Sequence, residues 1–374
     1  MTEFSTEELA RRHGVRNIAQ APKLWTTPDR VQEPVYCIVP VTNFNRFQTR
    51  WKHAVRTFEH LVKSGVILYV VEIAYGEREH AFDEFAPNKV SGDCHGIEST
   101  LMANCRHDDP NRGLHRYIKL RSSDDCWYKE NAITIAAARL PSDWKYLMYA
   151  DADIVFARPN FVSEALAQMQ RYPVVQMFSQ AQDLGPNYDV LSTRPSFVST
   201  WRSGNALGSD PGYYDGKPGP RHLGSWSGLC WGWRRDAWDA VGGIPDFCLH
   251  GGGDYSLAHV LIGQAHRGMR SDLAPGYISK MLDYQALCEK HIRRKIGFVS
   301  GVVSHFHHGP KAARRYVDRH KLLAVTQFDP NRDIRRDSQG LYRLVDDGSE
   351  RFLWLRDGLI EYSLQRNEDD VCVE

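Results

Sequence analysis

The feature that most constrains the fold of this chain is a short apolar run that ends in two aspartates. Residues 146 to 150 are apolar and too few for a helix, so they predict a buried strand. Asp151 and Asp153 follow directly, with Ala152 between them, and residues 154 to 156 are apolar again. Because side chains at i and i+2 of an extended backbone share a face, the two carboxylates point the same way. Such a pair suits a hard divalent cation and a ligand's phosphate oxygens. The same spacing occurs in solvated surface loops, but the buried segments on both sides favour a site.

Composition sets broad limits on the class of protein. The chain of 374 residues has room for one large α/β domain with extensions, or for two domains. A formal net charge of +1 gives the whole molecule no strong attraction to nucleic acid, so local patches have to be judged separately. The eight cysteines are scattered without a Cys-x-x-Cys pair, which argues against a zinc ribbon and favours a reducing compartment. With no long apolar run, we expect a cytoplasmic protein without a membrane segment.

The first third of the chain alternates strand and helix signals. After a polar extension with a short helix over residues 6 to 12, residues 35 to 40 predict a strand, and residues 47 to 64 a helix. A strand that leads through a polar loop into a helix is typical of a nucleotide-binding α/β sheet. Residues 67 to 71 predict the second strand, with Glu72 at its carboxyl end. There the carboxylate could bind a ribose or a base, or it could be a solvated strand end.

A lysine precedes the helix that we expect to pack beneath the acidic strand. Residues 132 to 140 are small and apolar and predict a buried helix. Lys129 lies at its start, where a bound diphosphate would need a cation.

The middle of the chain predicts a helix, a strand and then a long loop. Residues 160 to 172 predict the helix and residues 174 to 178 the strand. Residues 183 to 224 are rich in Gly and Pro, which predicts a lid, a binding loop or disorder. Tryptophans at 201, 226, 231, 233 and 238 are either core residues or a stacking surface for a sugar or a base.

Glycines also precede a candidate catalytic acid. Residues 227 to 246 predict a strand, a helix and a glycine stop. Residues 251 to 253 are all glycine, which lets the backbone approach a ligand closely and places Asp254 at the start of a helix. Asp254 could be a helix N-cap, or it could be the general base that deprotonates an acceptor hydroxyl.

Three histidines follow an apolar run near residue 303 and form the last candidate site segment along the chain. If residues 302 to 307 stay extended, His305 and His307 share a face and His308 lies at the following turn. A neutral imidazole is a suitable further ligand for a metal held by aspartates. Residues 293 to 336 contain eleven Lys or Arg and three Asp. That excess could be a solvated face, could neutralise a diphosphate, or could follow a polyanion such as DNA.

Taken in order over residues 35 to 310, these pieces resemble the GT-A class of metal-dependent, nucleotide-sugar glycosyltransferases. The motifs are most similar to those of the β-1,4-galactosyltransferase group. The resemblance implies a Rossmann-like, mixed but mainly parallel sheet flanked by helices, Mn²⁺ or Mg²⁺ as cofactor, and a UDP-sugar as donor. It also implies roles for individual residues. The residues expected to bind the donor are Pro40, Val41, Asn45, Arg46, Glu72, Trp127, Lys129, Asp151 and Lys311. The residues expected to bind the metal are Asp151, Asp153 and His305, with His308 as the reserve candidate, and Asp254 is the expected base. The residues expected to bind the acceptor are Trp231, His250, Gly252 and Gly253.

Departures from that pattern leave the acceptor open. Lys129 occupies the place of an arginine, Gly253 that of an acid, and His250 that of a tryptophan. Residues 305 to 319 also resemble glycosyltransferase-like proteins of bacteriophages, which makes a hydroxymethylated pyrimidine in phage DNA one candidate acceptor, beside a glycan or a small molecule. In that case the protein would work in a bacterial or phage-infected cell.

Two readings of another class stay open, as does the division into domains. The same acids and histidines could serve a metal-dependent phosphohydrolase, or the chain could be a nucleic-acid-binding module with a decayed enzyme core.

We expect an N-terminal extension (residues 1–33), a catalytic domain (34–312) with a donor half (34–160) and an acceptor half (161–312), and a helical C-terminal extension (313–374). The sequence does not indicate an oligomeric state.

Overall fold

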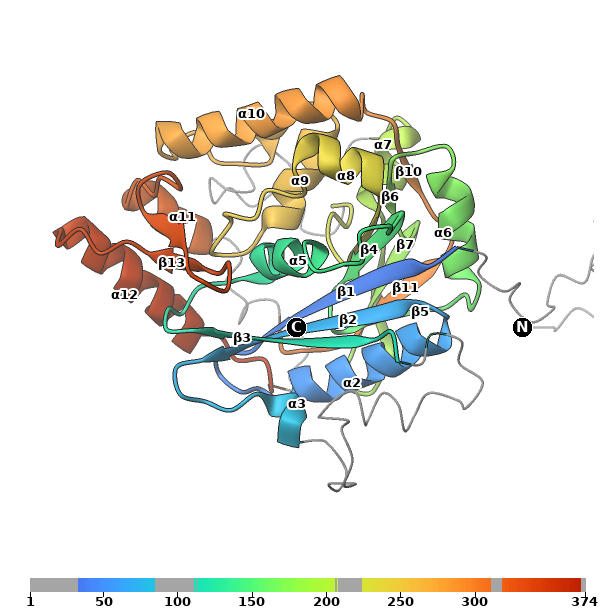
Figure 1. The fold of residues 1–374 in the computed structure, drawn as a ribbon, viewed down its shortest axis with the longest axis horizontal. Coiled ribbons are helices and arrows are strands. Elements are labelled where there is room, and N and C mark those ends of the chain that lie inside the picture. The colour runs from blue at the N-terminus through green and yellow to red at the C-terminus, as the bar shows by residue number, and fades with distance from the viewer. Residues whose placement is uncertain are drawn as a thin grey trace, which may run out of the picture.

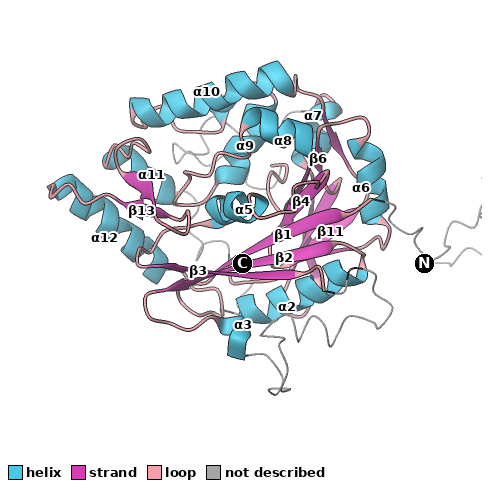
Figure 2. Ribbon diagram, in the orientation of Figure 1, coloured by secondary structure: helices cyan, strands magenta, loops and turns pink. Residues whose placement is uncertain are grey.

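A computed structural model describes residues 33–84, 111, 113–205, 207, 224–310 and 318–370. Its centre is a seven-stranded sheet in the order β10-β6-β9-β4-β1-β2-β3 (Figures 1 and 2). Only β9 runs antiparallel to its neighbours β4 and β6, and the other pairs are parallel. The strands are β1 (Val35–Thr42), β2 (Ile67–Tyr75), β3 (Arg116–Ser122), β4 (Tyr146–Ala150), β6 (Val174–Gln176), β9 (Cys230–Arg234) and β10 (Ile296–Phe298). The expected α/β class and the mixed, mainly parallel sheet are therefore confirmed.

Helices cover both faces of this sheet. They are α2 (Gln48–Lys63), α3 (Ala81–Glu84), α5 (Lys129–Ala137), α6 (Phe161–Met169), α7 (Phe197–Arg202), α8 (Arg235–Val241), α9 (Gly253–Leu261), the 3-10 turn η2 (Ala265–Arg267) and α10 (Pro275–His291). Successive residues of β1 enter opposite cores, because side chains alternate along a strand. Tyr36 and Ile38 pack on the side of α5 and α9, whereas Cys37 and Val39 pack on the side of α2 and α6. Figure 1 shows α2 beneath β1 and β2, with α5, α9 and α10 on the other side.

A second, four-stranded sheet brings the histidine segment to the acidic strand. Its order is β5-β11-β7-β8, and its strands are β5 (Ile154–Phe156), β7 (Gln180–Leu184), β8 (Val190–Pro195) and β11 (Val302–His305). In the register of β11, His305 is opposite Ile154 on one side and Asp183 on the other. The backbone N–H of Phe306 donates to the carbonyl of Asp153 at 2.8 Å. This pairing places residues 150 positions apart next to each other.

The C-terminal part consists of α11 (Asp318–Val325), β12 (Ile334–Arg336), β13 (Tyr342–Leu344) and α12 (Glu350–Leu364). Strands β12 and β13 form a hairpin in addition to the expected helices. Tyr342 donates two hydrogen bonds to the main body, from its N–H to Asn131 Oδ1 (3.0 Å) and from its hydroxyl to Asp246 Oδ1 (3.0 Å). These contacts attach the C-terminal part to α5 and to the segment after α8. The proposed domain division stays a prediction.

Some sequence-based boundaries were wrong. Strand β2 continues to Tyr75, because residues 72 to 75 pair in parallel with β3, so Glu72 lies within the strand and not at its end. The expected loop over residues 183 to 224 contains β8 and α7, whose side chains pack against β7 and β10. The strand and helix predicted within residues 227 to 246 are confirmed as β9 and α8, and Gly242 ends α8 in a left-handed conformation. The helix expected over residues 6 to 12 lies outside the described residues.

Two further properties of the described residues concern membrane-spanning helices and cysteines. Within the described ranges, no helix combines the length and the apolar character needed to cross a membrane. The cysteines at 37, 126, 230, 248 and 288 are buried free thiols.

Candidate active site

A cleft opens at the carboxyl ends of β1 and β4. It encloses about 930 Å³ of space, part of which is open to solvent. In parallel sheets, ligands bind beyond the carboxyl ends of the strands, and both aspartates of the acidic motif are there. The lining residues are Pro40, Val41, Thr42, Arg50, Trp127, Lys129, Glu130, Asp151, Ala152, Asp153, Trp226, Gly228, Leu229, Gly252, Asp254, His305, His308 and Arg366.

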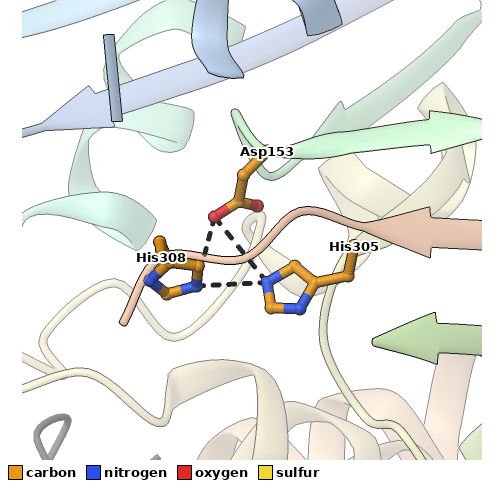
Figure 3. A group of neighbouring side chains, drawn as sticks. All are labelled: Asp153, His305 and His308. Carbon is orange, nitrogen blue, oxygen red and sulfur yellow. Dashed lines mark hydrogen bonds and ion pairs between the residues drawn. The ribbon is translucent and has the colours of Figure 1, made fainter. Parts of the chain in front are cut away.

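One wall of the cleft carries a cluster of three potential metal ligands (Figure 3). Oδ2 of Asp153 lies 3.7 Å from Nε2 of His305 and 3.4 Å from Nε2 of His308. The two Nε2 atoms are 3.2 Å apart. Figure 3 shows the three side chains pointing toward one another, with Asp153 from the turn after β4, His305 from the end of β11 and His308 from the loop that follows it. The cluster has the ligand types that Mn²⁺ accepts.

Each imidazole has a carboxylate within hydrogen-bond distance of its Nδ1 atom, the ring nitrogen on the side away from the cluster. His305 Nδ1 lies 3.1 Å from Asp183 Oδ1, and His308 Nδ1 lies 3.2 Å from Glu368 Oε2. A carboxylate at Nδ1 places the ring proton there and leaves the Nε2 lone pair for a metal. Two Nε2 lone pairs and a carboxylate oxygen then face one another, an arrangement that a cation stabilises.

The state of Asp153 also fits a bound cation. Its Oδ1 atom is buried without a hydrogen-bond partner among the described residues. Burial alone would raise the pKa of this carboxyl group, but the neighbouring imidazoles of His305 and His308 hold it well below its usual range. Asp153 is therefore ionised when it faces the two histidines. The residues present fit a divalent metal ion.

The opposite wall carries a lysine surrounded by carboxylates. Lys129 Nζ lies 2.5 Å from Asp151 Oδ1 and 4.0 Å from Asp254 Oδ2. Burial lowers the pKa of this amine, but Asp151 and Asp254 outweigh that effect and raise it. Lys129 therefore stays charged. Asp151 faces this lysine, whereas the three-ligand cluster is made of Asp153, His305 and His308.

Two glycines give the carboxylates of this wall their room. A Cβ atom at Gly228 would collide with Oδ2 of Asp254, and one at Gly253 would lie 2.6 Å from Oε1 of Glu130. Asp254 lies in the first turn of α9, as the sequence predicted, and its Oδ1 accepts from the N–H of Tyr255 at 2.8 Å. Oδ2 of the same carboxylate is left to face Lys129 and the cleft.

Glu130 is the most unusual acid of this wall. It is only 5% exposed, and its Oε2 atom is buried with no hydrogen-bond partner in the described part of the chain. The pKa of Glu130 is raised to about 7, because burial and the nearby carboxylate of Asp254 raise it by more than Lys129 lowers it. Near neutral pH, the protonated and the ionised forms of Glu130 are therefore close in free energy.

The structure separates the predicted donor residues into two groups. Pro40, Val41 and Trp127 line the cleft together with Lys129 and Asp151. Asn45, Arg46 and Glu72 are not among the residues that line this cleft. The Asn45 amide donates to the carbonyl of Ser363 (2.5 Å), Arg46 lies over the ring of Trp51, and Glu72 accepts from the N–H groups of Ala81 (2.7 Å) and Phe82 (3.4 Å). Glu72 thus caps α3, and a donor role for these three residues stays a prediction. Lys311 lies outside the described residues.

The predicted acceptor residues are also divided. Gly252 lines the cleft and Gly253 makes room for Glu130. Trp231 lies on β9 and is 0% exposed, and its indole N–H donates to the carbonyl of Ser227, so an acceptor role for it stays a prediction. His250 is buried, with Nε2 2.8 Å from Nδ1 of His320. The loop-borne tryptophan that does line the cleft is Trp226, whose ring meets that of His305 edge to face at 5.4 Å.

The histidine segment departs from the extended geometry that would place His305 and His307 on one face. Strand β11 ends at His305, so the two-residue alternation that paired His305 with His307 does not continue. The chain turns, His308 joins His305, and His307 Nε2 instead lies 3.0 Å from the carbonyl of Asp370. The sequence analysis did not identify Arg50, Glu130, Asp183, Arg366 or Glu368, because no local spacing marks residues that reach the site only through tertiary contacts.

Comparison with known proteins gives distant structural likenesses. No protein-family model matches the chain, and no curated protein matches it. Among solved structures, the chain is similar to glucosyl-3-phosphoglycerate synthase from Mycobacterium tuberculosis in complex with Mn²⁺, UDP and phosphoglyceric acid (12% identity, 80% of this chain and 78% of that one, TM-score 0.33). It is also similar to a mannosyltransferase from Pyrobaculum calidifontis in complex with GDP-Man and Mn²⁺ (11%, 90% and 75%, TM-score 0.37). A third is 4-diphosphocytidyl-2C-methyl-D-erythritol synthase from Anaerococcus prevotii (8%, 72% and 89%, TM-score 0.32). At such distances, the function has to be inferred from the residues of the cleft.

Proposed function

We propose that this protein is a metal-dependent glycosyltransferase of the GT-A class that moves a sugar from a nucleoside diphosphate sugar, a UDP-sugar in the first instance, to an acceptor hydroxyl. The observation that carries the proposal is the pairing of two unlike clusters in one cleft. One cluster, Asp153 with His305 and His308, suits a divalent cation. The other, Lys129 with Asp151 and Asp254, supplies a fixed positive charge and a candidate proton acceptor.

Asp153, His305 and His308 would hold the metal ion. Mn²⁺ or Mg²⁺ bound there would offset the negative charge that grows on the departing nucleoside diphosphate. Lys129 adds a second positive charge on the other wall, in a position fixed by its ion pair with Asp151. Since both charges are in place before the reaction, little reorganisation is needed as the sugar leaves.

Asp254 is the proposed general base. The acceptor oxygen forms a bond to the anomeric carbon, the bond from that carbon to the diphosphate oxygen breaks, and its electron pair leaves with the diphosphate. The acceptor's proton goes to Oδ2 of Asp254, the oxygen that faces Lys129 at 4.0 Å. A single displacement of this kind inverts the configuration at the anomeric carbon. If Asp254 is only a helix cap, a retaining reaction becomes the better description.

The acceptor class is left to experiment. Part of the basic stretch that suggested DNA is neutralised within the protein, since Arg336 pairs with Asp246 at 2.5 Å and Arg332 with Asp333 at 2.7 Å. Residues 311 to 317 of that stretch lie outside the described residues. Hydroxymethylated pyrimidine DNA, a glycan and a small molecule are therefore tested side by side.

The test is to incubate the protein with Mn²⁺, a panel of UDP- and GDP-sugars and each acceptor class, and to search by mass spectrometry for an added hexose or pentose. Reactions with EDTA, and reactions with the Asp153→Asn variant, are the matched controls and should show no transfer. Release of sugar phosphate or nucleoside monophosphate without an acceptor would indicate a phosphohydrolase instead. Steep, salt-dependent DNA binding without any turnover or nucleotide binding would favour the nucleic-acid-binding module.

A further inference from the structure

The six residues after α12 lie against the cleft. We call residues 365 to 370 the C-terminal strap. Asp369 accepts from the backbone N–H groups of Gln48 (2.9 Å) and Thr49 (2.8 Å) and thereby caps the first turn of α2. A Cβ atom at Gly309 would collide with the carbonyl of Asn367, so the strap passes directly over the loop that follows His308. These contacts dock the end of the chain onto the two segments that border the metal cluster.

Glu368 is the centre of this strap. It is 1% exposed and is surrounded by cationic or protonatable groups. Arg50 Nη2 donates to its Oε1 at 3.0 Å, Arg366 Nε donates to the same oxygen at 2.7 Å, and His308 Nδ1 lies 3.2 Å from Oε2. A buried carboxylate is retained at this depth only because such partners compensate for its lost hydration. Burial would raise the pKa of Glu368, but Arg50 and Arg366 hold it well below its usual range.

Arg50 connects Glu368 to the cleft. A guanidinium group has five N–H donors. Three of those of Arg50 have acceptors within the protein, since Nε and Nη2 donate to Glu368, and Nη1 donates to the carbonyl of Thr42 at 2.7 Å. The group lines the cleft, 5.2 Å from the centre of the Trp127 ring. Two charged donors therefore have no acceptor among the described residues and face a possible anionic ligand, and phosphate oxygens match a guanidinium group best.

We propose that the C-terminal strap completes the ligand site: Glu368 is a positioning residue that fixes the ring of His308 toward the metal and holds Arg50 for the phosphate groups of a nucleoside diphosphate. The inference rests on the proposed function for the nucleoside diphosphate, but metal and phosphate binding can each be measured without sugar transfer. Under this proposal, the C-terminal strap is part of the ligand site.

The first experiment compares three variants in two binding measurements. Mn²⁺ affinity is measured by electron paramagnetic resonance, and UDP affinity with Mn²⁺ present by calorimetry. Glu368→Gln should weaken Mn²⁺ binding 10- to 100-fold, as loss of an outer carboxylate does elsewhere, and should weaken UDP binding as well. Arg50→Met should weaken UDP binding about tenfold through the loss of charged hydrogen bonds, and should weaken Mn²⁺ binding less than Glu368→Gln does, since Arg366 and His308 remain beside Glu368. Glu350→Gln, which alters an exposed carboxylate at the start of α12, is the matched control and should change neither.

The second experiment needs no substitution, because removing a buried carboxylate could prevent folding. Hydrogen exchange is followed in the wild-type protein with and without Mn²⁺. Exchange should slow in peptides that cover the strap and residues 305 to 310, while a peptide from α10 (Pro275–His291) should not change.

The outcomes separate this inference from the proposed function. Wild-type Mn²⁺ affinity in a folded Glu368→Gln variant would overturn the inference, as would a strap whose exchange ignores Mn²⁺. If Mn²⁺ and UDP bind as expected but no sugar is ever transferred, the proposed function fails and the role of the strap stands. If sugar transfer proceeds in Glu368→Gln as in the wild type, with unchanged affinities, the proposed function stands and the role of the strap fails.

Discussion

The two walls of the cleft differ in the source of the positive charge that balances their carboxylates. The metal wall brings one carboxylate and two imidazole nitrogens together, with no lysine or arginine among the three, so a cation has to come from outside. The lysine wall brings three carboxylates, those of Asp151, Asp254 and Glu130, around the single ammonium group of Lys129. That wall already contains its cation. The difference teaches that two neighbouring aspartates of one motif serve different walls: Asp153 belongs to the metal wall and Asp151 to the lysine wall.

The largest expected effect is the loss of metal binding when a ligand of the metal wall is removed. Asp153→Asn should reduce Mn²⁺ affinity below detection and transfer at least about 10³-fold, because a metal site with three protein ligands loses its only anionic one. Asp151→Asn is the matched comparison from the same motif. Its carboxylate faces Lys129, so Mn²⁺ affinity should stay within about threefold of the wild type while turnover falls. Equal loss of Mn²⁺ binding in both variants would show that the division between the walls is wrong.

The next effect is on the lysine wall. Asp254→Asn should lower kcat about 10²- to 10⁴-fold, the usual contribution of a general base, and should leave the KM for the donor nearly unchanged. Steady-state kinetics at saturating Mn²⁺ measures both constants. A variant with near-normal kcat would reduce Asp254 to a helix cap.

A third prediction tests whether the position of the Asp254 carboxylate matters, with a substitution that removes no charge. Gly228→Ala puts a methyl group where Oδ2 of Asp254 lies, so the carboxylate has to move, and we expect kcat to fall about 10²-fold. Gly224→Ala is the control from the same segment, since its Cβ would meet no atom of the described residues within 4 Å. Mn²⁺ affinity should be the same in both proteins, and a loss of metal binding in Gly228→Ala would contradict the separation of the walls.

The smallest effect is a change of stability with pH. The pKa of Glu130 is about 7 in the folded protein, above its ordinary value of 4.5, so the folded state binds the proton more tightly than the unfolded state. Stability from this group is therefore present below about pH 4.5 and is lost as the pH rises through 7, by about 3 kcal/mol at most.

Replacing Glu130 tests this directly. In urea unfolding, Glu130→Gln should match the wild type near pH 5 and be more stable than it at pH 8. Glu361→Gln, which alters an exposed carboxylate, should follow the wild type at both values. A Glu130→Gln variant with no gain at pH 8 would show that Glu130 is not held in its protonated form.

Local pattern was informative wherever one element carries the signal. The apolar strand before Asp151, the glycine stop after α8 and the start of α9 at Asp254 each depend on a few adjacent residues, and each is where the sequence predicted it. The strand order was not predictable in this way. It depends on which strands pair, and β9 enters between β4 and β6 from a distant part of the chain.

The sequence by itself determined the α/β class, the position of the acidic motif at a strand end and the presence of histidines that could accompany it, because hydrophobic periodicity and side-chain chemistry are local properties. Only the tertiary structure decided that His308 and not His307 meets His305, that Asp151 faces Lys129, and that Asp183 and Glu368 hold the two imidazoles. Each of these depends on where a strand ends or on which distant segment packs against it. Such contacts are set by the packing of the whole chain, and no short stretch of sequence encodes them.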